Sequence, residues 1–431
     1  MARPRKKPKI NHGRNRTRID DLDDHMLTQI LVRLPNRATV IACSPVNKRW
    51  FSLISDPNFP VQFANHKKKT ATGSDHEDDE PPCTFITIMK SWRQLPFTEF
   101  IFGPRKLSLF FLPGRYTSLA RATYKDLVLC TNYRTFKGGG LVYYIANPFT
   151  KQWVALPPYP SDKSQGKRIT KFALICQSTK FRVVEIRIFR KDSSVDTFNM
   201  VVYCSEIGEW KEINLRIPEE VGQFRVSADK PEIVVCNDII YFKSGLRLVA
   251  LDPFDVNDAC DTTLEARVMP PLPKFGYLQE SSGHLLAVCT LKGNNVPSLW
   301  YEIDVTATLE LGMVVWKLDP NQVPLQWETT FQGLCKGIVN CIDIYTTIWN
   351  SNTRLERHIT TKGIGVHPYN DKLIYMYLAP TKQVVLCDTR TGCITSSEDL
   401  SYDAVRFHRL EQQWWPTSVP SLVQCLTVEE N

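Results

Sequence analysis

The residues that could bind a metal or act as nucleophiles are 13 cysteines and eight histidines, and neither set forms a recognised site pattern. The chain has no Cys-x-x-Cys pair, and its closest cysteine pairs, Cys335/Cys341 and Cys387/Cys393, have five residues between them. No histidine accompanies these pairs at zinc-finger spacing. We therefore expect free, buried thiols in a reducing compartment rather than a zinc site.

Motifs for phosphate, nucleotide or acyl chemistry are also missing from the sequence. It contains no P-loop, no Gly-x-Gly-x-x-Gly, no His-Glu-x-x-His and no Gly-x-Ser-x-Gly. The nearest features are a Lys-Gly-Gly-Gly run at 137–140, which fits a β-turn, and an acidic run at 76–80, which fits a solvated segment. We expect no enzymatic activity, no metal and no cofactor, and the alternative is an enzyme whose site is built on loops.

The positive charge is concentrated in a short N-terminal tail. Residues 1–18 hold eight basic residues and no acidic one, whereas the rest of the chain balances 45 basic against 45 acidic residues. Because the body is neutral, we expect no nucleic-acid partner, and no apolar run is long enough to span a membrane. The tail is either a solvated disordered segment or a nuclear-import signal, so we expect the nucleus or the cytoplasm. The signal would consist of Arg3, Arg5, Lys6, Lys7 and Lys9.

One amphipathic helix is predicted at residues 22–34. Its apolar residues recur at steps of three and four, which gathers them in one broad stripe. Aspartates crowd its first turn, where the helix dipole favours negative charge and where one of them can cap the helix, and Pro35 ends it. Two further apolar segments follow, up to residue 63. A unit this small cannot hide all its apolar surface, so a partner is expected to cover it.

The sequence predicts four successive parts. Residues 1–18 form the disordered tail, residues 19–63 a helical unit, and residues 64–82 a charged linker that ends in two prolines. From residue 83 to residue 431, short runs of β-branched and aromatic residues alternate with turn residues, which is typical of an all-β fold.

A repeat runs through this β region. Four segments begin with a turn or charged residue and end at a proline; Trp153 and Trp210 lie 57 residues apart, Val268 lies 58 residues further on, and Trp316 lies 48 beyond that. A period near 50 residues predicts a single β-propeller of about five to seven blades. We expect Trp153, Trp210 and Trp316 to pack between neighbouring blades. An array of immunoglobulin-like sandwiches, with a repeat nearer 100 residues, is the competing all-β fold.

The helical unit resembles an F-box, and the β region resembles the kelch-like, F-box-associated propeller domain of plant F-box proteins. The F-box match rests on an Ile-Leu pair, a Leu-Pro pair and a closing Lys-x-Trp-x-x-Leu-Ile-x-x-Pro-x-Phe pattern in residues 30–59. The propeller match rests on stretches such as ANPFTKQWVALPP and CNDIIYF. Two positions differ: the opening Leu-Pro of the pattern is Leu22-Asp23 here, and Pro45 interrupts the second helix, where we expect it to begin the third.

The resemblance implies a mostly β protein with an N-terminal three-helix F-box. It implies a substrate receptor of a cullin-RING (SCF-type) ubiquitin ligase, in which the F-box binds a Skp-type adaptor, and through it a cullin, while the propeller binds an unknown target protein. The two differing positions motivate an alternative, a non-ligase interaction scaffold built on the propeller. The resemblance assigns eleven residues to the adaptor contact or to the core beneath it, without dividing them: Leu22, Met26, Leu27, Ile30, Leu31, Leu34, Pro35, Val46, Trp50, Leu53 and Ile54.

Overall fold

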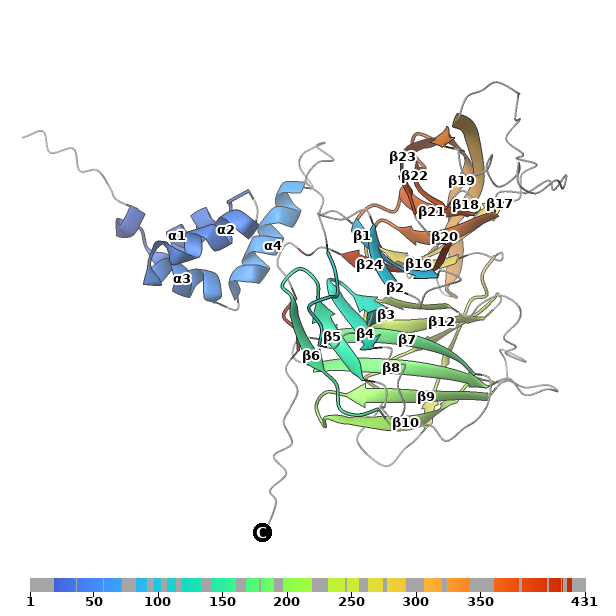
Figure 1. Ribbon diagram of the computed structural model, residues 1–431, viewed down its shortest axis with the longest axis horizontal. Coiled ribbons are helices and arrows are strands. Elements are labelled where there is room, and N and C mark those ends of the chain that lie inside the picture. The colour runs from blue at the N-terminus through green and yellow to red at the C-terminus, as the bar shows by residue number, and fades with distance from the viewer. Residues whose placement is uncertain are drawn as a thin grey trace, which may run out of the picture. The chain divides into compact units, whose positions relative to one another are not determined.

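The chain forms two compact units, residues 1–80 and residues 81–431, in the computed structural model (Figure 1). Each unit buries apolar residues of its own. The structure describes residues 19–35, 37–56, 58–71, 83–90, 97–101, 107–113, 118–132, 142–159, 168–177, 180–189, 197–218, 232–244, 246–255, 263–273, 277–291, 306–319, 324–340, 360–379, 382–400, 403–411, 413 and 417–420. Within these residues, no helix is both long and apolar enough to cross a membrane.

The first unit is helical. Its elements are η1 (Ile19–Asp21), α1 (Asp24–Leu31), α2 (Arg37–Cys43), η2 (Ser44–Val46), α3 (Lys48–Ser55) and α4 (Asn58–Ala71). The sequence predicts three helices and a linker from residue 64, whereas the structure has a fourth α-helix that continues through the first eight residues of that range. Helix α1 is also shorter than the predicted 22–34 segment, since it ends at Leu31.

Pro45 does not begin the third helix. It lies in the short 3₁₀ helix η2, and α3 begins at Lys48. Asn47 is the reason for this boundary, because its side chain accepts a hydrogen bond from the backbone N–H of Trp50 at 2.8 Å and so caps α3. The expectation for Pro45 is therefore wrong, but the proline is accommodated at the start of η2, where a missing N–H costs little.

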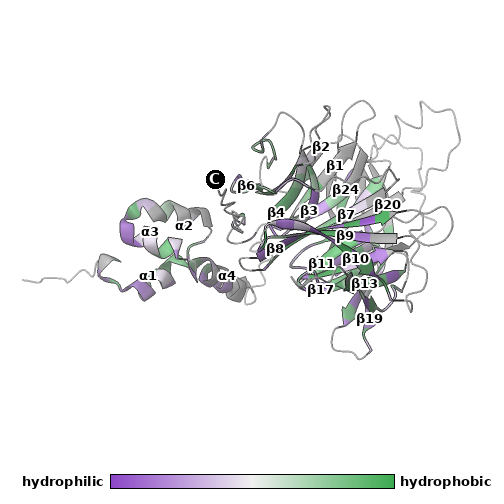
Figure 2. Ribbon diagram, turned by 90° about the horizontal axis from the view of Figure 1, so that it is seen from below, coloured by the Kyte–Doolittle hydropathy of each residue, from purple (hydrophilic) through white to green (hydrophobic). Residues whose placement is uncertain are grey.

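Every α-helix of the helical unit contributes side chains to a small core. Its buried apolar residues are Leu27, Leu31, Val32, Val40, Trp50, Ile54, Phe59 and Phe63. The rings of Phe59 and Phe63 stack at 6.4 Å on one face of α4, as their spacing of four residues requires. Hydrophobic and hydrophilic residues occur along the same helices (Figure 2), which is the pattern of helices buried on one side only.

The second unit consists of β-strands. They are β1 (Cys83–Lys90), β2 (Phe97–Ile101), β3 (Ser118–Tyr124), β4 (Leu127–Asn132), β5 (Tyr143–Asn147), β6 (Gln152–Ala155), β7 (Arg168–Gln177), β8 (Lys180–Phe189), β9 (Thr197–Cys204), β10 (Glu209–Arg216), β11 (Glu232–Cys236), β12 (Ile239–Ser244), β13 (Arg247–Leu251), β14 (Thr263–Glu265), β15 (Arg267–Met269), β16 (Tyr277–Ser281), β17 (His284–Leu291), β18 (Thr306–Asp319), β19 (Gln326–Asn340), β20 (Thr360–Val366), β21 (Leu373–Ala379), β22 (Gln383–Asp388), β23 (Cys393–Asp399) and β24 (Asp403–Glu411).

These strands pair into antiparallel sheets of neighbouring segments. The successive four-stranded groups are β3–β6, β7–β10, β11–β12–β13–β15, β16–β19 and β20–β23. The last two groups are joined at a single parallel pair, Lys336 with Cys393, and β14 adds a short parallel strand outside β10. The remaining sheet, β2–β1–β24, pairs the first strand of the unit with its last: Cys83 lies opposite Glu411.

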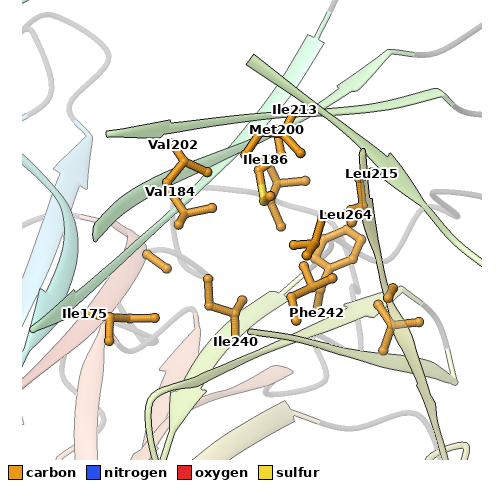
Figure 3. Close-up of a cluster of buried hydrophobic side chains, with 14 of the residues drawn as sticks. Ile175, Val184, Ile186, Met200, Val202, Ile213, Leu215, Ile240, Phe242 and Leu264 are labelled. Atoms are coloured by element: carbon orange, nitrogen blue, oxygen red, sulfur yellow. The ribbon is translucent and has the colours of Figure 1, made fainter. Parts of the chain in front are cut away.

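The first strands of the four-stranded groups form a closed ring with β24. Strand β3 contacts β7, β7 contacts β11, β11 contacts β16, β16 contacts β20, β20 contacts β24, and β24 contacts β3. Apolar side chains fill the space between successive sheets. Figure 3 shows one such core, in which Val184 and Met200 of one sheet lie opposite Ile240 and Phe242 of the next. Sheets stacked around an axis in this way form a β-propeller, the fold class that the sequence predicts.

Candidate functional site

Asp23 and Asn47 set the start of the two helices that carry most of the proposed adaptor residues. The Asp23 carboxylate accepts a hydrogen bond from the backbone N–H of Met26 at 2.7 Å, which makes Asp23 the N-cap of α1. Asn47 caps α3 in the same way. The side chain of Arg49, on α3, reaches back to the start of α1, where its Nε donates to Asp24 at 2.7 Å.

The structure divides the eleven residues that the sequence left undivided. Leu27, Leu31, Trp50 and Ile54 are buried and belong to the core of the helical unit. The remainder are half-buried or exposed; these are Leu22, Met26, Ile30, Leu34, Pro35, Val46 and Leu53. Only this second group has side-chain surface for a partner to cover.

The large exposed apolar side chains of the helical unit occur on η1, where Ile19 is 45% exposed, and on α1, η2 and α3. Met26 and Ile30 are 49% and 38% exposed and lie one turn apart on α1, while Val46 on η2 is 59% exposed. Phe51 on α3 is also 59% exposed, and the sequence analysis did not select it. The sequence could have indicated this exposure, because successive residues on a helix point about 100° apart and the neighbouring Trp50 is buried. We call Met26, Ile30, Val46 and Phe51 the exposed apolar set.

The three tryptophans assigned to the propeller repeat do not occupy equivalent places. Trp210 lies on β10, the outermost strand of its four-stranded group, and its Nε1 donates to the carbonyl of Pro157 at 3.2 Å. Trp153 lies on the corresponding strand β6 but is 42% exposed. Trp316 is buried on β18 and packs between its own sheet and the preceding one, as expected, but β18 is the third strand of its group, so its equivalence to Trp210 in the repeat is wrong.

The residue equivalent to Trp210 is Trp327, which the sequence analysis missed. It lies on the outermost strand β19, and its Nε1 donates to the carbonyl of Pro270 at 3.3 Å. Both proline carbonyls come just after the outermost strand of the preceding group. Trp327 follows Val268 by 59 residues, which continues the earlier steps of 57 and 58 better than Trp316 does. This nearly constant spacing between repeats could have identified Trp327 from the sequence.

Hydrogen bonds connect the turns around one end of the propeller ring. Asp238 accepts from Tyr124 Oη at 3.0 Å and from Gln177 Nε2 at 3.3 Å, so it ties together the turns after β3, β7 and β11. Asn237 donates to the Gly283 carbonyl at 2.9 Å, which extends the chain of contacts to the turn after β16. Burial, followed by the charge of Asp238, raises the pKa of Tyr124.

Arg409 of β24 continues these connections to the strand that closes the ring. Its guanidinium donates to Glu280 of β16, to Glu411 at 2.7 Å and to the Val366 carbonyl of β20 at 3.3 Å. The backbone N–H of Glu411 in turn donates to the Lys125 carbonyl at 2.9 Å, beside β3. This end of the propeller is therefore cross-linked by polar contacts that stabilise the closure of the ring.

A second polar cluster lies within the sheet of β7–β10. Arg187 is 1% exposed; it contacts Glu185 and Glu212, each at 3.2 Å, and donates a hydrogen bond to Tyr159. Burial raises the pKa of the Glu185 carboxyl, and the charge of Arg187 opposes that rise. Because each group is matched by an opposite charge or a hydrogen bond, this cluster has the features of an ion network that supports the fold.

The described residues contain no group of three or more histidine, cysteine, aspartate or glutamate side chains that could hold a metal ion. The cysteines whose side chains the structure describes are free thiols. The proposed import signal, Arg3, Arg5, Lys6, Lys7 and Lys9, lies outside the described residues. It therefore stays a prediction.

One known protein family matches most of the chain. A family model described as "F-box protein At3g26010-like, beta-propeller" matches residues 106–413. The comparison with curated proteins finds no match. Among solved structures, a putative 6-phosphogluconolactonase from Bacteroides fragilis is 10% identical with a TM-score of 0.35, covering 78% of this chain and all of its own. TolB from Acinetobacter baumannii is 9% identical with a TM-score of 0.37, covering 80% of this chain and 70% of its own.

Proposed function

We propose a function from the premise that the family match establishes: the chain belongs to the At3g26010-like F-box proteins, which it matches over their β-propeller domain. In this proposal the protein is the substrate receptor of an SCF-type ubiquitin ligase. The helical unit is its F-box and binds a Skp-type adaptor, which connects it to a cullin. The propeller binds a target protein whose identity is open.

One observation carries this proposal beyond the family match: the helical unit leaves large apolar side chains in solvent. Met26, Ile30, Val46 and Phe51 are each between 38% and 59% exposed, although the unit has a buried core of its own. Apolar side chains gathered on so small a unit favour a protein partner that covers them. In the proposed complex the exposed apolar set contacts the adaptor, and Leu27 and Leu31 support it from the core.

The propeller supplies a rigid platform in this proposal. The ring made by β3, β7, β11, β16, β20 and β24 supports a count of six blades, with β24, β1 and β2 as the closing blade. The receptor holds its target near a ubiquitin-charged enzyme and so raises the effective concentration of the reacting groups. It performs no chemistry, needs no cofactor and binds no nucleic acid. We place it in the nucleus or the cytoplasm, with residues 3–9 as the import signal.

The test uses the full chain with two substitutions on α1, Met26→Asp and Ile30→Asp. A carboxylate buried against a partner without a counter-charge costs several kcal/mol, so the double variant should lose co-purification of a Skp-type adaptor and a cullin from cell extract. Phe110→Asp is the matched control, because Phe110 is an apolar side chain of the propeller unit that is 89% exposed. It should leave recovery of the adaptor unchanged.

A second function, the non-ligase scaffold, is separated by the same experiment. It is motivated by Asp23 and Pro45, the two positions at which the chain differs from the F-box pattern. The scaffold function predicts that the wild-type protein recovers neither adaptor nor cullin while still capturing other proteins through the propeller. If the wild type recovers the adaptor and the α1 double variant recovers it equally well, the contact proposed for α1 is wrong.

A further inference from the structure

Arg49 joins α3 to the segment that precedes α1. Its Nε donates to the Asp24 carboxylate at 2.7 Å, and its Nη2 donates to the backbone carbonyl of Leu22 at 2.5 Å. The Arg49 side chain is 35% exposed and that of Asp24 is 68% exposed, so both contacts lie near the surface of the helical unit. Together they hold the residues on both sides of Asp23, Leu22 through its backbone and Asp24 through its side chain.

Asp23 occupies the position at which the F-box pattern has a proline. Its backbone dihedrals are φ −70° and ψ 167°, and this φ lies within the range that a proline ring imposes. Asp23 reaches this conformation without a ring: its carboxylate caps α1 by accepting from Met26 N–H, and Arg49 holds the preceding carbonyl. Hydrogen bonds therefore hold the backbone conformation of Asp23, which the ring of a proline would fix covalently in the F-box pattern.

We propose that Arg49 is a positioning residue for partner binding by the helical unit. By fixing Leu22–Asp24, it fixes the start of α1, and therefore the direction in which Met26 and Ile30 present their side chains. The proposal rests on the proposed function, since the partner is the Skp-type adaptor. The proposal gives a role in adaptor binding to Arg49, which acts through its contacts with Leu22 and Asp24 of the same chain.

Preorganisation is the physical basis of this role. An exposed ion pair adds little to folding stability, so the loss of the Arg49–Asp24 pair does not unfold the unit. The loss does let the first turn of α1 fray, because helix ends are ordered mainly by their caps and local contacts. A partner must then order this turn on binding, and that cost lowers affinity.

The experiment measures binding of the full chain to a purified Skp-type adaptor by calorimetry. Arg49→Met keeps the aliphatic stem and removes every donor, and it should raise the Kd about tenfold. Arg49→Lys keeps one charged donor and should give an intermediate Kd. Arg33→Met is the matched control, because Arg33 follows the C-terminal end of α1 and its side chain donates to Gln29 of α1, away from the Leu22–Asp24 segment. It should bind like the wild type.

Two further readouts separate positioning from general destabilisation. In the free Arg49→Met protein, amide hydrogen exchange should speed up in residues 22–27 and stay unchanged in α3 and α4, and saturation with adaptor should restore the wild-type rates. In an Asp23→Pro background, the ring fixes φ covalently, so Arg49→Met should cost less than about threefold in Kd.

The results distinguish failure of this inference from failure of the proposed function. A wild-type protein that does not bind the adaptor overturns both. A wild type that binds, with an Arg49→Met variant of equal Kd and equal exchange, overturns only the positioning role. The role is also wrong if exchange speeds up throughout the helical unit, or if the Asp23→Pro background keeps the full tenfold loss.

Discussion

Trp210 and Trp153 offer a direct test of which repeat tryptophan stabilises the propeller. The Trp210 ring lies 5.8 Å from Tyr143, 5.0 Å from Tyr159 and 5.3 Å from Tyr203, and its Nε1 donates to the Pro157 carbonyl. Trp210→Ala removes all these contacts and leaves a cavity at the junction of two sheets. Truncating a buried aromatic residue costs about 3–5 kcal/mol of unfolding free energy, and the half-buried position of Trp210 places it near 3.

Trp153→Ala is the matched control, because Trp153 stands on the corresponding outermost strand. Its side chain is 42% exposed and has one edge contact with Tyr144 at 5.7 Å, so its removal should cost about 1 kcal/mol or less. Trp210→Phe separates the hydrogen bond from the packing and should cost about 1 kcal/mol. Urea unfolding followed by the β-sheet circular dichroism signal measures all three variants. Equal losses for Trp210→Ala and Trp153→Ala would refute the assignment of the junction to Trp210.

Three further substitutions test other contacts in the propeller, each measured by urea unfolding. Arg187→Met leaves the buried Glu185 without its closest counter-charge and should cost about 3–5 kcal/mol; an unchanged midpoint would contradict this. Burial, followed by the charge of Arg409, lowers the pKa of His367 from 6.5 to about 4. The neutral ring therefore contributes stability that is complete above pH 6.5 and is lost as the pH falls through 4, and His367→Gln should lose less stability across that window. Gly337→Ala would place a Cβ 2.4 Å from Ile394 Cβ and should cost about 1–3 kcal/mol, and a neutral result would mean that β19 and β23 are not this close.

The propeller could be predicted because its signal is local. Short runs of strand-forming residues alternate with turns, and the whole pattern recurs about every 57 residues. This spacing indicates how many strands one repeat contains, without any knowledge of which distant residues are in contact. The error at Trp316 arose because a Trp followed by a proline was used as the mark of the repeat. The proline after Trp316 belongs to the connection between β18 and β19, and the matching tryptophan comes after it, at position 327.

The closure of the ring could not be predicted in this way. Strand β1 pairs with β24 across more than 300 residues, and no local pattern tells which distant strand will complete a sheet. The polar contacts of Arg409 depend on that closure, because Arg409 stands on β24, and those of Asp238 join the turns of three different sheets. Their residue types are ordinary turn and surface residues in the sequence, so nothing local marked them.

Asp23 and Pro45 show why residue identity alone is a poor guide at the two positions where the chain differs from the F-box pattern. A motif position constrains a backbone geometry, and different residues can meet the same constraint. Asp23 takes a φ of −70° that a proline would also take, and it adds a cap that a proline lacks. Pro45 is placed at the start of a 3₁₀ helix, and Asn47 then starts α3 independently of it. Neither difference therefore prevents the helices from forming, and adaptor binding becomes a question about Met26, Ile30 and their neighbours rather than about the motif.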